Sequence, residues 1–344
     1  MAPNAAKALE NVSLVGQHKT AVILGGTLGM GAAVARLLAK LGCSRIIVFG
    51  RNETRGKEMV ETLKQRAPKG SMVDADEVKG MRASATSLLE TAGQGAIDYL
   101  VMCQSGVPTG HLDDVNADGF DLDLRVQAIS RFAIAYLLTT GGALTPNAIV
   151  MSIANQGQSL DDLSIDDLAL KNRLATRSKT VFFLDQSKRD STHRGQQARQ
   201  LCRMPSNCLA TAFEACNRYL PRLLPPVTVL DSFHEEFSIR YPQYRFFHIY
   251  PGLVSSENFD YDLFPGFMKY VAWLGMKVIG QTPDQFAPAP VYILASPDAA
   301  KTLGPNNKYF NWKLSPGKLG TWAANPKNRE ALWEKLLEII GEKQ

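Results

Sequence analysis

Short apolar runs alternate with stretches of helical periodicity along this chain. Five runs are rich in β-branched and aromatic residues, as in strands buried in a parallel sheet: 19–24, 44–49, 97–103, 148–153 and 244–250. A weaker run at 78–83 is interpreted as a further strand. Helical spacing marks 32–41, 53–66, 87–94, 118–140 and 325–341. This alternation predicts an α/β fold in which helices cover both faces of a doubly wound parallel sheet.

A glycine-rich turn connects the first strand to the first helix. Gly25, Gly29 and Gly31 are spaced as G-x-x-x-G-x-G, and Gly42 ends the helix. Glycines in this position let the backbone approach a pyrophosphate that the helix N-terminus holds. The turn therefore predicts dinucleotide binding by its glycines and by the residues between them, which are Thr27, Leu28 and Met30.

The end of the second strand indicates which dinucleotide is bound. An NAD site offers Asp or Glu to the ribose hydroxyls at this point, but this chain has Gly50, Arg51 and Asn52. A guanidinium pairs with a 2′-phosphate, whereas a carboxylate repels it. Arg51 and Asn52 therefore favour NADPH over NADH. The alternative is a solvated arginine at a strand end.

Composition and charge narrow the class of protein. The chain has 344 residues, of which 45% are apolar and 21% charged, as in a soluble globular protein. Its net charge of +5 comes from one segment, since residues 171–203 hold nine Lys or Arg against two Asp. A basic stripe with interleaved aromatic residues is missing elsewhere, which argues against a nucleic-acid partner.

Cysteines and apolar segments bear on location. Five cysteines without a C-x-x-C pair suit a reducing compartment, and the N-terminus lacks an apolar signal region, so a cytoplasmic protein is expected. Residues 266–280 are interrupted by Lys269 and Lys277 and are too short to span a bilayer, so no integral membrane segment is predicted. They are expected to form a buried or partly buried helix, with shallow membrane contact as an alternative.

His111 and His248 lack partners at metal-ligand spacing, so no metal site is predicted.

One domain is predicted, with extensions at both ends. Residues 1–17 form an N-terminal tail, 18–300 the sheet domain, and 301–344 a C-terminal extension with a terminal helix. The helix could pack on the body or on a second subunit. Residues 171–207 are atypical, basic and weakly patterned. One interpretation is a substrate lid. The other is sequence added to, or substituted for, the helix that would bear the catalytic residues, as from an imperfect gene model.

Several motifs together resemble the short-chain dehydrogenase/reductase superfamily. These are GGTLGMG after the first strand, FGRN at the end of the second, and PGLVSS after the run at 244–250. The stretches VMCQSG, GFDLDL, ISRFAIAYLL, AIVMSIANQG and RFFHIYPGLV are similar to a fungal branch whose members commonly serve secondary metabolism. The resemblance implies a Rossmann-type fold, NADP(H), a small organic substrate and often a homodimer or tetramer.

The resemblance also places further cofactor contacts. The turn after the strand at 97–103 aligns with Cys103 to Gly106, which adds Gln104 and Gly106. The turn after the strand at 244–250 adds Pro251, Gly252, Val254 and Ser256. Of these, Val254 and Ser256 would hold the nicotinamide.

The catalytic residues of the superfamily are only partly recovered. Its Tyr-x-x-x-Lys pair is not found where expected, and Tyr309 and Lys313 have the spacing but lie too late in the chain. Tyr219 is the nearest phenol with a cation, Arg222, on the same helical face, although Pro221 lies between them. The usual serine register falls on Ala154, so Ser152, on the same strand face, is the substitute. A structural hydroxyl is the alternative role for Ser152.

Two charged residues complete the set of catalytic candidates. Arg131 lies one helical turn after Gln127, which aligns with an asparagine of the superfamily, and would hold a carbonyl oxygen or an acidic substrate. Asp166 is a candidate acid after the strand at 148–153. The alternatives are that Arg131 pairs structurally with Asp166 or Asp167, and that the aspartates cap a helix or face water.

These observations predict an NADPH-dependent oxidoreductase that reduces a carbonyl or imine of a bulky, apolar small molecule through a non-standard proton donor. Two alternatives stay open because the Tyr and Lys pair is missing. One is non-redox cyclase or isomerase chemistry in a cofactor-bound fold. The other is an inactive regulatory protein that binds NADPH.

Overall fold

Six parallel strands form a single sheet at the centre of the molecule. The computed structural model describes residues 3–63, 78–105, 119–120, 122–154, 163–168, 224–255 and 268–342. The strand order is β2-β1-β3-β4-β5-β6. The strands are β1 (Thr20–Leu24), β2 (Arg45–Phe49), β3 (Ile97–Met102), β4 (Leu144–Ile153), β5 (Arg245–Tyr250) and β6 (Tyr309–Asn311). Because all are parallel, their carboxyl ends meet at one edge, where α/β folds bind ligands.

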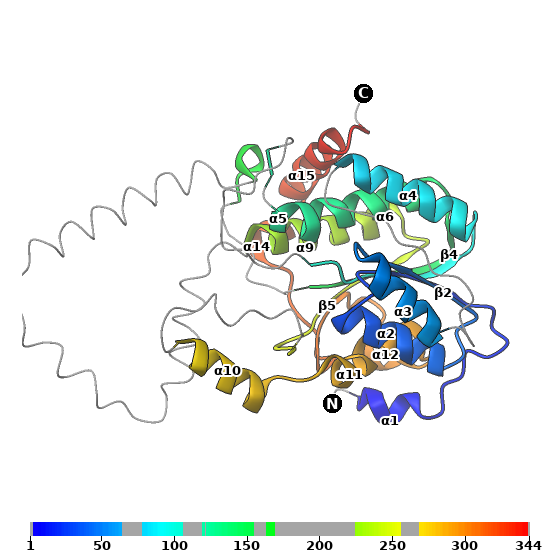
Figure 1. The fold of residues 1–344 in the computed structure, drawn as a ribbon. Coiled ribbons are helices and arrows are strands. Elements are labelled where there is room, and N and C mark those ends of the chain that lie inside the picture. The colour runs from blue at the N-terminus through cyan, green and yellow to red at the C-terminus, as the bar shows by residue number, and fades with distance from the viewer. Residues whose placement is uncertain are drawn as a thin grey trace, which may run out of the picture.

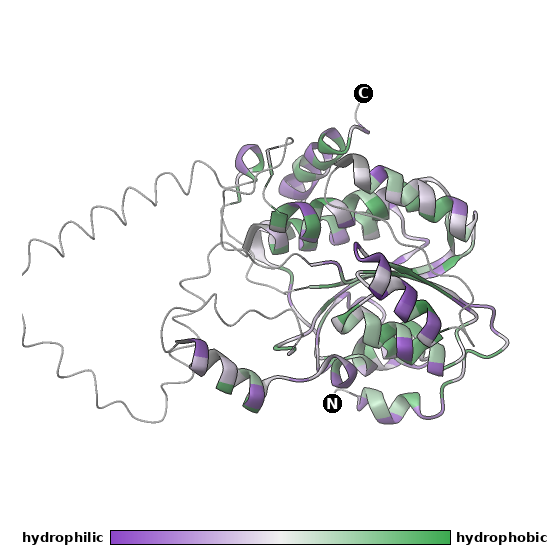
Figure 2. Cartoon of the chain, in the orientation of Figure 1, coloured by the Kyte–Doolittle hydropathy of each residue, from purple (hydrophilic) through white to green (hydrophobic). Residues whose placement is uncertain are grey.

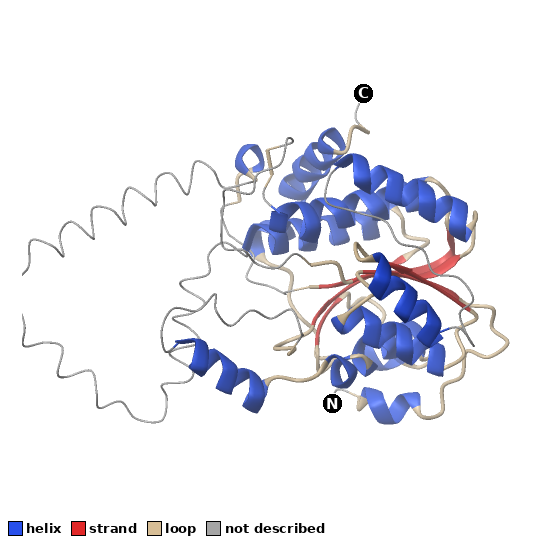
Figure 3. Ribbon diagram, viewed as in Figure 1, coloured by secondary structure: helices blue, strands red, loops and turns tan. Residues whose placement is uncertain are grey.

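Helices cover both faces of this sheet (Figures 1 and 3). One layer contains α1 (Ala5–Leu9), α2 (Gly29–Lys40), α3 (Glu53–Leu63), α11 (Pro283–Phe286), α12 (Pro288–Ala295) and α13 (Ala299–Leu303). The other contains α4 (Val78–Ala92), α5 (Leu122–Leu124), the π-helical turn η1 (Arg125–Ile129), α6 (Ser130–Thr140), α9 (Leu224–Arg240), α14 (Thr321–Ala324) and α15 (Pro326–Ile339). Each layer buries its own hydrophobic core against the sheet. The predicted Rossmann-type, doubly wound sheet is confirmed.

The strand predicted at 78–83 is wrong, because these residues open helix α4. The side chains of Met81, Ala85, Leu88 and Ala92 are buried, and their spacing of three or four residues is the helical period. The helix packs on α6. A strand read from a short apolar run is easily confused with a buried helix, since length is what separates them.

The segment expected to be an extension contributes to the body of the fold. Tyr309–Asn311 forms β6, which pairs with β5 at the edge of the sheet. In α15, Trp333 lies against Phe132 and Phe237, with ring centroids 5.0 and 4.8 Å apart. The terminal helix therefore packs on its own chain.

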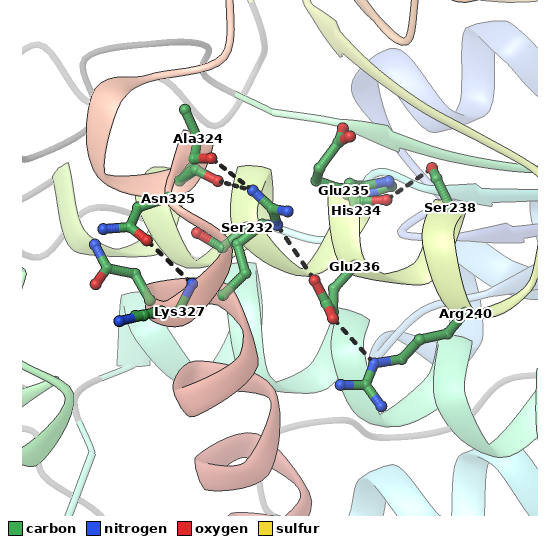
Figure 4. Close-up of polar contacts among 12 residues, drawn as sticks. Ser232, His234, Glu235, Glu236, Ser238, Arg240, Ala324, Asn325 and Lys327 are labelled. Carbon is green, nitrogen blue, oxygen red and sulfur yellow. Dashed lines mark hydrogen bonds and ion pairs between the residues drawn. The ribbon is translucent and has the colours of Figure 1, made fainter.

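Polar contacts fix α15 to α9 (Figure 4). Buried Arg329 donates to Glu236 Oε2 at 3.2 Å and to the carbonyl oxygens of Ala323 and Ala324 at 2.9 Å. Arg240 donates to the other oxygen of Glu236 at 3.2 Å. The carboxylate therefore has a cation on each side.

Helix α10 (Met268–Ile279) projects from the body beside α11 (Figure 1). Met276 is buried, whereas Tyr270, Leu274 and Val278 are exposed. Among the described helices, none is long and apolar enough to cross a bilayer.

Candidate nucleotide and substrate site

The turn after β1 is a cradle that only glycine allows. Gly25 has a φ of 71°, and the amides of Gly25 and Gly26 donate to the carbonyl of Phe49 at 2.8 and 3.1 Å. A Cβ on Gly31 would lie 2.4 Å from the carbonyl oxygen of Gly25. The start of α2 therefore lies directly against the end of β1, in a close approach of backbones that a side chain at either glycine would prevent.

The N-terminus of α2 suits an anion. Leu28 is its N-cap and gives no side-chain hydrogen bond, and its first turn holds no acidic residue. The first amides of a helix lack partners within the helix, and the helix dipole is positive there. The cradle from Gly25 to Gly31, with Thr27, Gly29 and Met30, therefore fits the pyrophosphate of a dinucleotide.

The loop that carries Arg51 lies beside this cradle. A Cβ on Gly50 would lie 2.6 Å from Thr27 Cγ2, so the ends of β1 and β2 are in close contact. The side chain of Arg51 is exposed at this position. Asn52 Oδ1 accepts a hydrogen bond from the amide of Arg55 at 2.9 Å, which caps the start of α3. The structure thus gives Asn52 a helix-capping role in addition to the predicted cofactor contact.

Arg131 connects the ends of β3 and β4. The turn after β1 packs against the backbone of Gln104, because a Cβ on Gly25 would lie 2.7 Å from the Gln104 amide nitrogen. Arg131 Nη2 then donates to the carbonyls of Gln104 at 2.8 Å and of Ile153 at 3.1 Å. These two bonds replace the pairing with Asp166 or Asp167 that the sequence left open.

The environment of Arg131 is unusual for a cation. The residue is 1% exposed, and its Nε and Nη1 atoms have no hydrogen-bond partner within the described part of the chain. Burial lowers the pKa of Arg131 to about 10, so it remains charged at neutral pH. Arg131 lies in the first turn of α6, directly after the π-helical turn that contains Gln127. Such turns are frequent at functional sites.

Ser152 is buried against α9. Its Oγ is 2.7 Å from His234 Nε2, and its exposed fraction is 0%. Ser152 pairs with His248 across β4 and β5, and the His234 ring stacks on the His248 ring at 6.0 Å. The Ser152 hydroxyl thus has a buried partner, as expected for the alternative, structural role. The catalytic role of Ser152 stays a prediction.

A second polar pair lies beside this contact. His248 Nδ1 is 2.7 Å from Asp231 Oδ1 in α9, and Tyr309 donates to the Asp231 carbonyl at 3.2 Å and to Glu235 at 3.0 Å. Burial, and then the neighbouring His248, hold the pKa of His234 well below its usual value. The sequence did not predict this cluster, although Asp231, His234 and Glu235 recur at helical spacing in α9.

The turn after β5 forms the other wall of the site. Pro251 accepts a hydrogen bond from Gln281 Nε2 at 2.7 Å, and Val254 forms a parallel bridge with Gln281. Gly252 has a φ of 69°, and a Cβ there would lie 2.7 Å from Trp312 Cδ1. Pro251, Gly252 and Val254 therefore lie at the carboxyl edge of the sheet, and their contact with a nicotinamide stays a prediction.

The remaining candidates are dispersed. Asp166 is exposed in the short η2 helix (Ile165–Asp167), which packs on α15, and it makes no hydrogen bond or ion pair with the residues described. Tyr219, Gly106 and Ser256 lie outside the described residues, as does the segment 171–207.

Two residues at this edge were missed. Tyr250 ends β5 directly before Pro251, and burial raises the pKa of its phenol, which keeps it protonated at neutral pH. Trp312 follows β6 and contacts Gly252. The position of Tyr250 before the Pro-Gly turn was a usable signal, whereas the approach of Trp312 depends on a strand that the pattern did not predict.

Comparison with known proteins agrees with this geometry. Residues 19–140 match the family model of the short chain dehydrogenases. Oxidoreductase calI from Penicillium decumbens is 25% identical over 200 residues, which are 53% of this chain and 57% of that protein. Versicolorin reductase 1 from Dothistroma septosporum is 30% identical over 119 residues, 34% of this chain and 44% of that protein. The chain therefore spans about half the length of these curated relatives.

A solved structure shares the fold. The blue fluorescent protein from a metagenomic library, crystallised in complex with NADPH, has a TM-score of 0.53 at 14% identity. The alignment covers 83% of this chain and 92% of that one. By sequence, residues 19–140 are similar to the short chain dehydrogenases, and the described part of the chain shares the fold of this solved structure.

Proposed function

We propose that this protein is an NADPH-dependent oxidoreductase that reduces a carbonyl or imine of a bulky, apolar small molecule in secondary metabolism. The observation that carries the proposal is the cradle between Gly25 and Gly31, which has no room for a side chain and which adjoins Arg51. Relatives named as oxidoreductases, including a versicolorin reductase, support the reaction class. The NADPH bound to a fold neighbour supports the cofactor.

The residues at the carboxyl edge divide the work by position. The amides at the start of α2 bind the pyrophosphate, and Arg51 pairs with the 2′-phosphate. Gln104, Pro251, Gly252 and Val254 are the described residues that would hold the nicotinamide end. Gly106 and Ser256 are further candidates from the sequence and lie outside the described residues. When bound, the reduced nicotinamide supplies a hydride.

Arg131 orients the substrate and stabilises negative charge. Its Nε and Nη1 nitrogens have no partner among the described residues and are buried, where a charged hydrogen bond to a developing oxyanion is strong. The proton comes from a group other than a Tyr and Lys pair. Tyr219 and Asp166 are the candidates from the sequence, and Tyr250 is the candidate that the structure adds.

Cofactor preference tests the first half of the proposal. Replacing Arg51 by alanine should weaken NADPH binding by on the order of tenfold to 100-fold and leave NADH binding unchanged, because hydrogen bonds to charged groups contribute about 1.5–3 kcal/mol. Titration of intrinsic fluorescence with each nucleotide measures this. Arg55→Ala, an exposed arginine one turn later in α3, is the matched control. Equal NADPH affinity in wild type and Arg51→Ala would refute the assignment.

Turnover tests the second half. Loss of NADPH absorbance should be observed with members of a panel of bulky aromatic ketones and cyclic imines, and Arg131→Met should abolish it. One alternative is favoured by a specific observation: Ser152 is sealed under α9, as in a fold that binds the nucleotide without hydride transfer. Tight NADPH binding with no oxidation across the panel would support that non-redox or regulatory role. The cytoplasmic location and the homodimer or tetramer stay predictions.

A further inference from the structure

The turn after β5 is fixed by a residue that lies just before α11. Gln281 makes three hydrogen bonds to the segment 251–255, each to a different residue. Its side-chain Nε2 donates to the carbonyl oxygen of Pro251 at 2.7 Å. Its backbone amide donates to the carbonyl of Leu253 at 2.9 Å, and its own carbonyl accepts from the amide of Ser255 at 2.9 Å. One residue therefore holds this segment at its beginning, middle and end.

The side-chain bond fixes a peptide unit that the two backbone bonds do not touch. Gly252 has a φ of 69°, and a glycine adopts positive and negative φ with similar ease, so the residue type alone does not set the orientation of the peptide before it. This peptide is trans, and a trans peptide directs its C=O and its N–H to opposite sides. The bond from Gln281 to the Pro251 carbonyl therefore also fixes the direction of the Gly252 amide.

A second contact to the same turn comes from the end of β6. Trp312 is the first residue after this strand, and its Cδ1 would lie 2.7 Å from a Cβ on Gly252. The turn that carries Trp312 is itself closed by backbone bonds, since the Asn311 amide donates to the Ser315 carbonyl at 3.0 Å and the Leu314 amide to the Asn311 carbonyl at 2.8 Å. The turn after β5 is thus held by two separate parts of the chain.

The position of Gln281 is set by the helix that follows it. Thr282 caps α11 reciprocally: its hydroxyl oxygen accepts from the Gln285 amide at 3.2 Å, and Gln285 Oε1 accepts from the Thr282 amide at 2.8 Å. Phe286 at the end of α11 is buried, and α12 directly after it is mostly hydrophobic (Figure 2). Gln281 therefore extends from a helix that is anchored in the core of this layer.

This helix connects the two ends of the proposed nucleotide site. α11 packs on α2, the helix whose N-terminus is assigned to the pyrophosphate, and Arg36 Nη2 of α2 lies 2.6 Å from Asp284 Oδ1 of α11. The resemblance to the short-chain dehydrogenases places the nicotinamide contacts in the segment after β5. α11 and Gln281 thus join the helix at the phosphate end to the segment at the nicotinamide end.

We propose that Gln281 is a positioning residue for the nicotinamide end of the cofactor site. It acts through the segment 251–255 and does not itself touch the reacting atoms. Because this role requires NADPH at the carboxyl edge of the sheet, it rests on the proposed function.

A positioning role and a purely structural role have different consequences for binding. If Gln281 only stabilised the fold, its loss would weaken the binding of every part of the nucleotide alike. If it positions the segment 251–255, its loss weakens the binding of NADPH and spares 2′-phospho-ADP-ribose. This nucleotide has the same phosphates for the glycine cradle and Arg51 and lacks the nicotinamide ring.

Calorimetric titration of the full chain with these two nucleotides tests the proposal. Gln281→Met keeps the length of the side chain and removes the donor. It should weaken NADPH binding by roughly threefold to tenfold, the effect of one hydrogen bond, and leave the binding of 2′-phospho-ADP-ribose unchanged. Gln281→Glu places an acceptor against the Pro251 carbonyl and should lose more NADPH affinity than Gln281→Met.

Gln17→Met is the matched control. Gln17 Nε2 also donates to a backbone carbonyl, that of Ser13, at 2.7 Å, but Gln17 precedes β1 and so lies toward the opposite edge of the sheet. This variant should bind both nucleotides as tightly as wild type.

Each other outcome counts against a different statement. Wild-type NADPH affinity in Gln281→Met overturns the positioning role and leaves the proposed function standing. An equal loss for both nucleotides in Gln281→Met also overturns it, since Gln281 would then act on the site as a whole. If wild type binds neither nucleotide, the cofactor assignment fails, and the proposed function fails with it. The titrations need no substrate, so none of these outcomes depends on identifying one.

Discussion

At the residue scale, two kinds of positions determine what the site can do. Gly25 and Gly31 allow β1, α2 and the turn after β3 to approach closely, since neither position has space for a Cβ. Arg131 supplies charge, since its guanidinium is buried and its Nε and Nη1 nitrogens lack partners in the described chain. In the proposed function the first kind holds a nucleotide and the second holds an anionic oxygen. Binding and chemistry therefore rest on different residues, which allows them to be tested separately.

Gly31→Ala tests the requirement for space. The added methyl group would lie 2.4 Å from the Gly25 carbonyl oxygen, so α2 must shift away from β1. We expect the free energy of unfolding to fall by about 1–3 kcal/mol. We also expect NADPH affinity to fall by roughly tenfold or more. Urea unfolding and nucleotide titration measure the two effects. Gly275→Ala, whose Cβ meets open space, should change neither, and retained NADPH affinity in Gly31→Ala would contradict the cradle.

At the element scale, α9 is the helix whose polar side faces the sheet. His234 and Asp231 reach Ser152 and His248 on β4 and β5, while Glu236 on the other side binds Arg329 of the C-terminal helix (Figure 4). Buried polar groups must be paired, so these contacts specify how α9 lies on the sheet.

A pH dependence of stability follows from His234. The pKa of His234 is held well below 6.5 in the folded state. Below pH 6.5 this histidine is therefore protonated in the unfolded chain but stays neutral in the native state. Stability is therefore unaffected by this group above pH 6.5 and falls as the pH decreases, by up to about 1.4 kcal/mol per pH unit.

Urea unfolding between about pH 7 and about pH 5 measures this slope. His234→Gln cannot titrate and should lose less stability over that range than wild type, even if it is less stable at neutral pH. His18→Gln, a change at an exposed histidine, should retain the wild-type slope. Identical slopes in wild type and His234→Gln would show that the proton uptake lies elsewhere.

How much the sequence predicts depends on how local each signal is. The strand, turn and helix around Gly25 are encoded in consecutive residues, and the structure has them where the pattern put them. The run at 78–83 failed because six residues cannot separate a strand from the start of α4. The contact between Ser152 and His234 joins positions 82 residues apart. No local pattern can indicate such a pairing, since it exists only once α9 packs on β4.

At the scale of the whole molecule, both ends of the chain close around one sheet. α1 packs on α12, and β6 and α15 come from the last part of the sequence. The stretch after residue 300 supplies an edge strand that pairs with β5, the Trp312 contact with Gly252, and Trp333 in the aromatic core. A segment with these contacts belongs to the cooperative unit of the fold rather than to an appendage.

Truncation distinguishes these two roles of the C-terminal segment. Removing residues 304–344 exposes the edge of β5 and the rings of Phe132 and Phe237, and it leaves Glu236 without Arg329. Loss of a core tryptophan alone costs about 3–5 kcal/mol, and Glu236 keeps only Arg240 as its partner. Together these losses approach the about 5–15 kcal/mol that stabilises a typical domain. We therefore expect the truncated chain to lack a cooperative thermal transition by circular dichroism, whereas a chain ending at Glu342 unfolds like wild type. A truncated chain that still unfolds cooperatively and binds NADPH would instead show that the segment is a true extension.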